Sequence, residues 1–130
     1  MLQAGRLQFQ PMYSSQVLDH FENPRNAGEV PNPDVRVRLE NPACGDILEL
    51  TAKIKDGVVT EIRFRAKGCV SAMACGSLLT EMVAGKTIHE AAAIPREYLV
   101  SEIGGLPQAS GHAGHLAIDT LKALLAKAGG

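Results

Sequence analysis

The 130-residue chain lacks a long apolar run, a strong net charge and a regular set of cysteines. No apolar stretch approaches the ~20 residues that a membrane-spanning helix needs. The formal net charge of −1, from 13 basic and 14 acidic residues, gives no indication of a polyanionic partner such as nucleic acid. The three cysteines are odd in number and irregularly spaced, which argues against a disulfide framework. These absences favour a protein of the reducing cytosol whose thiols are free or metal-bound.

Internal repeats, low-complexity segments and dividing linkers are also absent, so the sequence predicts a single domain. We expect residues 13–130 to form this domain and residues 1–12, which are mixed and polar, to be a mobile lead-in. The first residues lack the apolar stretch of roughly 7–15 residues found in secretory signals. A cytoplasmic location is therefore expected.

Three stretches alternate between apolar and polar residues, as strands with one covered and one solvated face do. They are "VRVRL" from residue 35, "DILELTAKI" from residue 46 and "VVTEIRFRA" from residue 58. The intervening "KDG" fits a three-residue hairpin loop with Gly57 in the left-handed conformation. That loop pairs Ile54 with Val58 and Leu48 with Phe64, which keeps the apolar faces together.

Helical patterns precede and follow these strands. We expect helices at residues 13–21, 69–85 and 115–130, each with an apolar side. Thr87 and Glu90 have the spacing of a capping box at the start of a further short helix. The predicted fold class is α+β, a small antiparallel three-stranded sheet with helices packed on one face.

Residues able to bind a metal gather at one end of the predicted sheet. Cys44 and Asp46 stand before the second strand, in "NPACGD", and Cys69 follows the third, in "KGCVSAM". The predicted pairing puts Cys44 opposite Gly68, and directly paired residues have Cβ atoms ~5 Å apart. A register shifted by two residues still puts Cys44 and Asp46 opposite residues 68–70. The three side chains should therefore converge on one site.

The chemistry of these side chains suits a metal. Cys69 begins a helix, where free N–H groups and the helix dipole favour a thiolate. Thiolates are the ligands of zinc and of iron–sulfur clusters. A tetrahedral site needs a fourth ligand. His112, in a loop before the last helix, is the best candidate, and His115 is the alternative.

Each candidate also has an ordinary structural interpretation. A lone cysteine is often a small core residue, Asp46 can cap a turn, and His112 can cap the final helix. Cys75 is expected outside the site, because six helical residues separate it from Cys69 by ~9 Å along the axis and ~120° around it. We interpret Cys75 as a core or neighbouring-surface thiol and His20 as a surface or packing residue.

Four stretches together resemble the IscU/NifU N-terminal family of iron–sulfur cluster scaffold proteins. They are "YSSQVLDHFENPRNAG", "NPACGD", "KGCVSAMACGSLLTEMVAGK" and "LAIDTLKALLAK", and the resemblance covers about residues 13–128. It implies an α+β fold and a scaffold or carrier, with no catalytic residues. It also implies that Cys44, Asp46, Cys69 and His112 bind the iron or the cluster.

Two departures from the family pattern bear on function. Ala113 stands where the family has its third cysteine, which holds the cluster and accepts sulfur from the cysteine desulfurase. The sequence from Leu106 reads "LPQAS", whereas IscU proteins use Leu-Pro-Pro-Val-Lys to bind their dedicated Hsp70 chaperone. That chaperone is therefore not an expected partner.

Two main functional hypotheses follow. In the first, the protein is a scaffold that transiently binds iron or a [2Fe–2S] cluster, receives sulfur from a cysteine desulfurase and delivers the cluster to apo-proteins. Cys69 or Cys44 would then accept sulfur as a persulfide. In the second, it is a zinc-binding regulatory relative that has lost sulfur acceptance but keeps the desulfurase-binding surface. Zinc is expected in the purified protein in either case, and a third hypothesis is an interaction domain without metal.

Overall fold

A computed structural model describes residues 13–129 of the chain. The predicted lead-in at residues 1–12 lies outside the described residues. No helix among those described is long and apolar enough to cross a membrane. The elements in chain order are α2 (Ser15–Glu22), β1 (Val35–Glu40), β2 (Ile47–Lys55), β3 (Val58–Lys67), α3 (Val70–Val83), α4 (Ile88–Ala92), α5 (Arg96–Glu102), η1 (Gln108–Ser110) and α6 (His112–Lys127).

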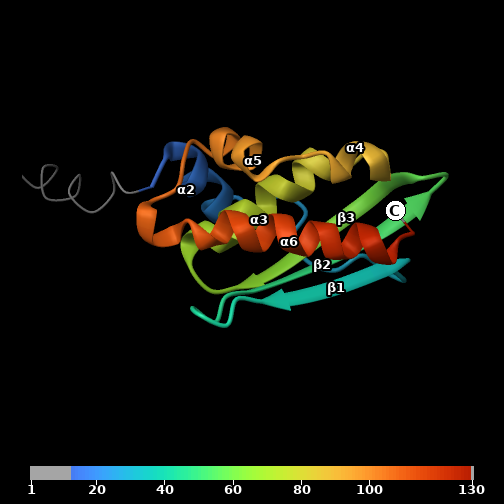
Figure 1. Ribbon diagram of the computed structural model, residues 1–130, viewed down its shortest axis with the longest axis horizontal. Coiled ribbons are helices and arrows are strands. Elements are labelled where there is room, and N and C mark those ends of the chain that lie inside the picture. The colour runs from blue at the N-terminus through green and yellow to red at the C-terminus, as the bar shows by residue number, and fades with distance from the viewer. Residues whose placement is uncertain (1–12, 130) are drawn as a thin grey trace, which may run out of the picture.

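The described chain folds into two layers, with helices on one face of a three-stranded antiparallel sheet of order β1-β2-β3 (Figure 1). The strand residues that alternate toward the helices are buried, among them Leu48, Leu50 and Ile62. Helix α3 lies at the centre of the helical layer and contacts α2, α5, α6 and β3. The predicted α+β fold class is confirmed.

The β2–β3 hairpin is tighter than the sequence predicts. Lys55 pairs with Val58, so Asp56 and Gly57 alone form the turn. Both turn residues have positive φ, 53° and 75°, as in the type I′ turn that Asp-Gly favours. The predicted three-residue loop is therefore wrong.

The tighter turn and a one-residue bulge beside it each shift the predicted register by one residue, so that the shift beyond the bulge is two residues. The ladder leaves Thr60 of β3 without a partner, so that Leu48 pairs with Ala66 and not with Phe64. Val59 consequently faces the core and is fully buried. Beyond the bulge, the shift by two keeps every side chain on its predicted face. The apolar faces therefore still meet, and the start of β2 still lies beside the start of α3.

Two helices also differ from prediction. Helix α6 begins at His112, three residues earlier than expected, so this histidine belongs to a helix and not to a loop. Helix α5 was not predicted, because its short sequence follows Pro95 without a side-chain cap. The capping box of α4 is confirmed. The Thr87 hydroxyl accepts the backbone N–H of Glu90, and the Glu90 carboxylate accepts the backbone N–H of Thr87.

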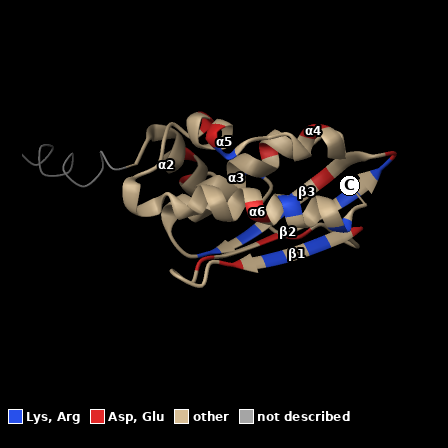
Figure 2. Cartoon of the chain, in the orientation of Figure 1, with Lys and Arg blue, Asp and Glu red and all other residues tan. Residues whose placement is uncertain are grey.

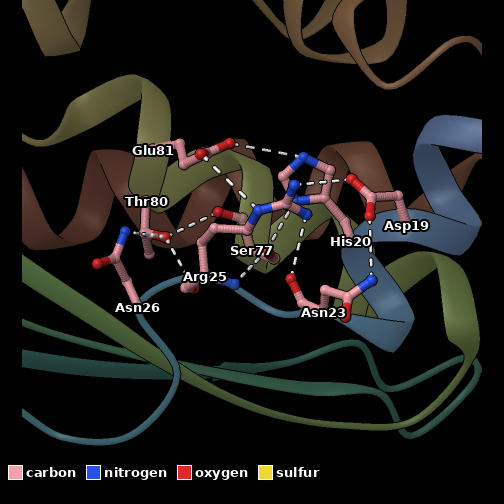
Figure 3. Close-up of polar contacts among 8 residues, drawn as sticks. All are labelled: Asp19, His20, Asn23, Arg25, Asn26, Ser77, Thr80 and Glu81. Carbon is pink, nitrogen blue, oxygen red and sulfur yellow. Dashed lines mark hydrogen bonds and ion pairs between the residues drawn. The ribbon is translucent and has the colours of Figure 1, made fainter.

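A polar cluster fastens α2 and the following turn to α3 (Figure 3). The Ser77 hydroxyl lies 2.7 Å from His20 Nδ1 and accepts the backbone N–H of Arg25 at 2.9 Å. Glu81 lies 3.6 Å from His20 Nε2, and Arg25 forms an ion pair with Asp19. Burial and the nearby Arg25 lower the pKa of His20. The packing interpretation of His20 thus agrees with its place in the structure.

Candidate metal centre

The turn between β1 and β2 presents Cys44 to solvent. The Asn41 side chain accepts the N–H of Ala43 at 2.9 Å, and the Asn41 carbonyl accepts that of Gly45 at 2.7 Å. The Asn41 N–H donates to the carbonyl of Asp46, which closes the loop. Gly45 has a φ of 78°, a conformation that glycine adopts without strain. The loop leaves Cys44 exposed and Asp46 only 4% exposed.

The junction of β3 and α3 supplies the second thiol. Cys69 is the N-cap of α3, and its Sγ accepts the N–H of Ala72 at 3.4 Å. Its own N–H donates to Asp46 Oδ1 at 3.2 Å. Gly68 has a φ of 146°, and a Cβ at this position would overlap the Asp46 carboxylate. A glycine is therefore required for the carboxylate to lie against the start of α3.

His112 reaches the same place from the start of α6. Its Nε2 lies 3.1 Å from Asp46 Oδ2, and its side chain is 29% exposed. The three contributing segments all lie at the left end of the sheet, opposite the C-terminus (Figure 1). The predicted convergence is thus present, although His112 comes from a helix.

The four side chains form one cluster around Asp46. One ligand atom each of Cys44, Asp46 and His112 lies within 4.8 Å of the others. Cys69 Sγ lies 3.3 Å from Asp46 Oδ2 and 4.0 Å from His112 Nε2. Ligand atoms around a tetrahedral zinc stand about 3.3–3.8 Å apart, given metal–ligand bonds of 2.0–2.3 Å. Cys69, Asp46 and His112 lie close to this spacing, and Cys44 lies within 4.8 Å of Asp46 and His112. Two sulfurs, an imidazole and a carboxylate are donors that suit zinc or iron.

Asp46 is charged despite its burial. Burial by itself raises the pKa of this carboxyl. Hydrogen bonds from the Cys69 thiol and N–H, from His112 and from Cys44 outweigh that effect and lower its pKa overall. The Asp46 carboxylate therefore carries a negative charge at neutral pH, which favours a cation.

The helix start favours the Cys69 thiolate, as expected, because the N–H groups of Ala72 and Ser71 lower the pKa of this thiol. Burial and the neighbouring Asp46 carboxylate outweigh this effect and raise the pKa of Cys69 overall. A bound cation would reverse the balance, because its charge stabilises a coordinating thiolate.

The remaining candidates lie elsewhere. Cys75 is fully buried in the core, and burial raises the pKa of its thiol to about 12. His115 is exposed and lines a hollow with Arg96 and Asp119 on the side of α5. Ala113 follows His112 in α6 and is 1% exposed. The position at which the resemblance places the family's third cysteine thus holds a packed methyl group next to the site.

Sequence reasoning missed two residues that shape the site. Gly68 makes room for the Asp46 carboxylate, and Asn41 forms the turn that presents Cys44. The Asn-Pro pair at residue 41 is a turn signal that could have revealed the second. The need for Gly68 cannot be seen in the sequence, because it depends on how closely the Asp46 carboxylate approaches residue 68 in the folded chain.

Comparison with known proteins agrees with this fold. The model of the NifU-like N-terminal domain matches residues 12–128. This chain belongs to the IscU/NifU family. The iron–sulfur cluster assembly scaffold protein IscU of Escherichia coli K12 is 43% identical over 118 residues, covering 88% of this chain and 91% of the relative. IscU 1 of Archaeoglobus fulgidus is 43% identical over 111 residues, covering 85% of this chain and 72% of the relative.

Solved structures of IscU/NifU-like proteins share the fold. A proposed scaffold protein of the SUF system from Fervidobacterium islandicum has a TM-score of 0.75 at 19% identity, covering 88% of this chain and 97% of the other. A NifU-like protein from Brucella abortus has a TM-score of 0.73 at 21% identity, covering 92% and 95%. At these identities the likeness supports the arrangement of strands and helices alone.

Proposed function

We propose that this member of the IscU/NifU family is an iron–sulfur cluster assembly scaffold. It transiently binds iron or a [2Fe–2S] cluster through Cys44, Asp46, Cys69 and His112 and delivers the cluster to apo-proteins. The observation that carries the proposal is the meeting of these four side chains around one buried carboxylate. Relatives that are 43% identical are named iron–sulfur cluster assembly scaffold proteins, which supports it.

The donor set can hold a cluster without a third cysteine. Imidazole replaces thiolate on one iron in some [2Fe–2S] proteins. Here Cys44 and Cys69 would supply thiolates, and His112 and Asp46 would supply a nitrogen and an oxygen. Such a mixed set binds iron less tightly than four thiolates. The cluster would accordingly be labile, as release to an acceptor requires.

Sulfur would enter through Cys44. This thiol is exposed, whereas burial and Asp46 raise the pKa of Cys69. The Cys44 thiolate would attack the outer sulfur of a cysteine desulfurase persulfide. The S–S bond of the desulfurase breaks, a new S–S bond forms on Cys44, and the desulfurase cysteine leaves as a thiolate. Mass spectrometry after incubation with an active desulfurase should find one added sulfur on Cys44, and none on either site cysteine would contradict this step.

The role is that of a carrier and not of an enzyme, because every proposed step moves sulfur, iron or cluster that another protein supplies or receives. The partners are a cysteine desulfurase and apo-protein acceptors, in the cytoplasm. A dedicated Hsp70 chaperone is not among them, since the "LPQAS" segment from Leu106 departs from the motif that it recognises.

A second candidate function is a zinc-binding regulatory relative, and one observation favours it. Ala113 is packed into the core at the position of the family's third cysteine. Two cysteines, a histidine and an aspartate make a complete tetrahedral zinc set. In this case zinc would stabilise the loop ends that carry the ligands, without any sulfur acceptance.

Anaerobic reconstitution with ferrous iron, cysteine, a desulfurase and a dithiol that reduces the transferred sulfur to sulfide distinguishes the two functions. The scaffold proposal expects the natural protein to acquire the visible absorption of a cluster and Cys44→Ala to lose it. Cys75→Ala is the matched control, because this thiol lies in the core and outside the site. If only Ala113→Cys assembles a cluster, while the natural protein retains one zinc per chain, the zinc function replaces the scaffold function.

A further inference from the structure

The charges of this chain are divided between its two layers. Strands β1, β2 and β3 carry seven lysines and arginines and three glutamates, whereas helices α2 to α6 carry three basic and seven acidic residues. Figure 2 shows the basic residues concentrated along the strands. Although the net charge is only −1, the sheet is basic and the helical layer is acidic.

The basic side chains of the strands lie mainly on the outer face of the sheet. Arg38 and Arg65 both pair across from Glu49, and Lys67 pairs across from Ile47, in the positions that alternate with the buried core residues. No helix covers this face (Figure 1). The outer sheet face comprises Arg36, Arg38, Glu49, Lys53, Arg63, Arg65 and Lys67, with Glu40 and Glu61 at its margins.

Part of this charge is neutralised within the chain and part is not. Arg36 and Arg65 form ion pairs with Glu29 and Glu49, and Arg63 pairs with Glu61. Among the described residues, Arg38, Lys53 and Lys67 form no ion pair, and Arg38 and Lys67 are exposed. The outer sheet face thus keeps cations available for a partner.

A hollow of about 220 Å³ lies between the available cations. Its lining comprises Arg38, Ile47, Glu49, Arg65, Ala66 and Lys67. The hydrocarbon of Ile47 and Ala66 lines it together with three cationic groups and one carboxylate. A hollow of this size and lining fits one acidic side chain, whose methylene groups contact the apolar part while its carboxylate meets the cations.

We propose that the outer sheet face docks the acidic surface of a partner protein, with one partner carboxylate seated between Arg38 and Lys67. Charge complementarity selects this occupant. Glutamates alternate with the arginines across the face, so a partner that mixes carboxylates with hydrogen-bond donors matches it better than a uniform polyanion does. The acidic helical layer would also repel a polyanion long enough to pass around the molecule.

The hollow lies next to the proposed metal site, so a docked partner would be close to the cluster. Ile47 directly follows Asp46, and Lys67 stands two residues before Cys69. A partner held there lies beside the exposed Cys44, at the end of the sheet where the cluster would form. This closeness to the cluster depends on the proposed scaffold function, whereas the docking itself does not.

The test uses the metal-free full chain and an acidic peptide probe. A 12-residue peptide of alternating Glu and Gly is added to the ¹⁵N-labelled protein at low ionic strength, and amide shifts are followed by NMR. We expect shifts centred on Arg38, Glu49 and Lys67. The double variant Arg38→Glu/Lys67→Glu should weaken binding at least tenfold. The matched control Lys86→Glu/Lys122→Glu makes the same change in net charge on the helical side and should alter the affinity less than twofold.

Four outcomes would overturn the proposal. Equal weakening in both double variants would show a response to net charge alone, and shifts centred elsewhere would exclude this face. Tighter binding of a DNA duplex to the same amides would make the face a polyanion site. Concentration-dependent dimerisation that Arg38→Glu/Lys67→Glu abolishes would identify a second copy of the chain as the occupant.

Two further variants separate the loss of positive charge from added repulsion, and peptide binding from cluster assembly. Arg38→Gln/Lys67→Gln removes the charges without introducing repulsion, and it should give an intermediate loss with an unchanged spectrum of the free protein. Cys44→Ala should bind the peptide like the natural chain. If cluster assembly fails while the peptide still binds at the hollow, the docking surface stands without the scaffold function.

Discussion

The two ends of the sheet are joined to the helical layer by different kinds of contact. At the hairpin end, backbone groups satisfy one another: the N–H of Val59 donates to Lys86, that of Gly85 to Val59 and that of Ile88 to Gly57. At the other end, two thiols, an imidazole and a carboxylate from three segments meet and contact each other. The hairpin end is thus closed by backbone hydrogen bonds. The site end depends on side-chain contacts among groups that a cation can bind.

Gly68→Ala should show this difference most strongly. A Cβ at position 68 overlaps the Asp46 carboxylate, and the φ of 146° is strained for alanine. We expect a loss of about 3 kcal/mol in unfolding free energy, from backbone strain and the displaced carboxylate together. Urea unfolding measures it.

Gly57→Ala at the hairpin end is the matched control. Its φ is also positive, at 75°, but no atom lies within 4 Å of the added Cβ. We expect a loss of about 1 kcal/mol with zinc affinity unchanged. If Gly68→Ala costs no more than Gly57→Ala, the close approach of Asp46 to the chain at residue 68 is not important for the fold.

Zinc should stabilise the site end and leave the hairpin end unaffected. At a free zinc concentration of 100 times Kd, the expected gain in unfolding free energy is about 2.7 kcal/mol. Cys44→Ala or His112→Ala should remove most of this gain, because each takes away one ligand. Thermal unfolding with zinc and then with a chelator measures it. His115→Ala should gain as much stability from zinc as the natural chain does. Loss of the gain in this variant would show that His115, and not His112, is the fourth ligand.

Thr87→Ala tests the hairpin end by itself. It removes the side-chain acceptor of the α4 capping box and should cost about 1 kcal/mol. The zinc-dependent gain in stability should remain as in the natural chain. A reduced gain would mean that the two ends are coupled.

The polar cluster around His20 gives the smallest effect, a dependence of stability on pH. Burial and Arg25 lower the pKa of this histidine below its usual 6.5 in the folded protein. The unfolded chain therefore binds more protons, so the stabilisation present above pH 6.5 is lost as the pH falls toward the folded pKa. His20→Gln should flatten the unfolding free energy between pH 6.5 and pH 5, roughly the range of histidine titration. An unchanged slope would mean that other groups cause the dependence.

The sequence was sufficient to predict which side chains meet at the site, but not the strand register that brings them together. The convergence of Cys44 and Asp46 on Cys69 survived a wrong register, because a shift by two residues preserves the facing of side chains. The bulge at Thr60 has no clear local signal, and it decides the register together with the Asp-Gly turn.

Two other features needed the three-dimensional structure. His112 starts a helix without any side-chain cap, so no capping residue marked the boundary. The alternating arginines of β1 and β3 were visible in the sequence, but which face of the sheet stays uncovered depends on where the helices pack. The basic outer sheet face is therefore a property of tertiary packing.

The most direct test of the central claim is the ligation of the cluster in the reconstituted natural protein. After anaerobic reconstitution and one-electron reduction, pulsed EPR on protein labelled with ¹⁵N-histidine reports nitrogen bound to iron. We predict coupling to a single imidazole, absent in His112→Ala and retained in His115→Ala. A cluster without nitrogen coupling, or a coupling that persists in His112→Ala, would contradict the four-residue site described here.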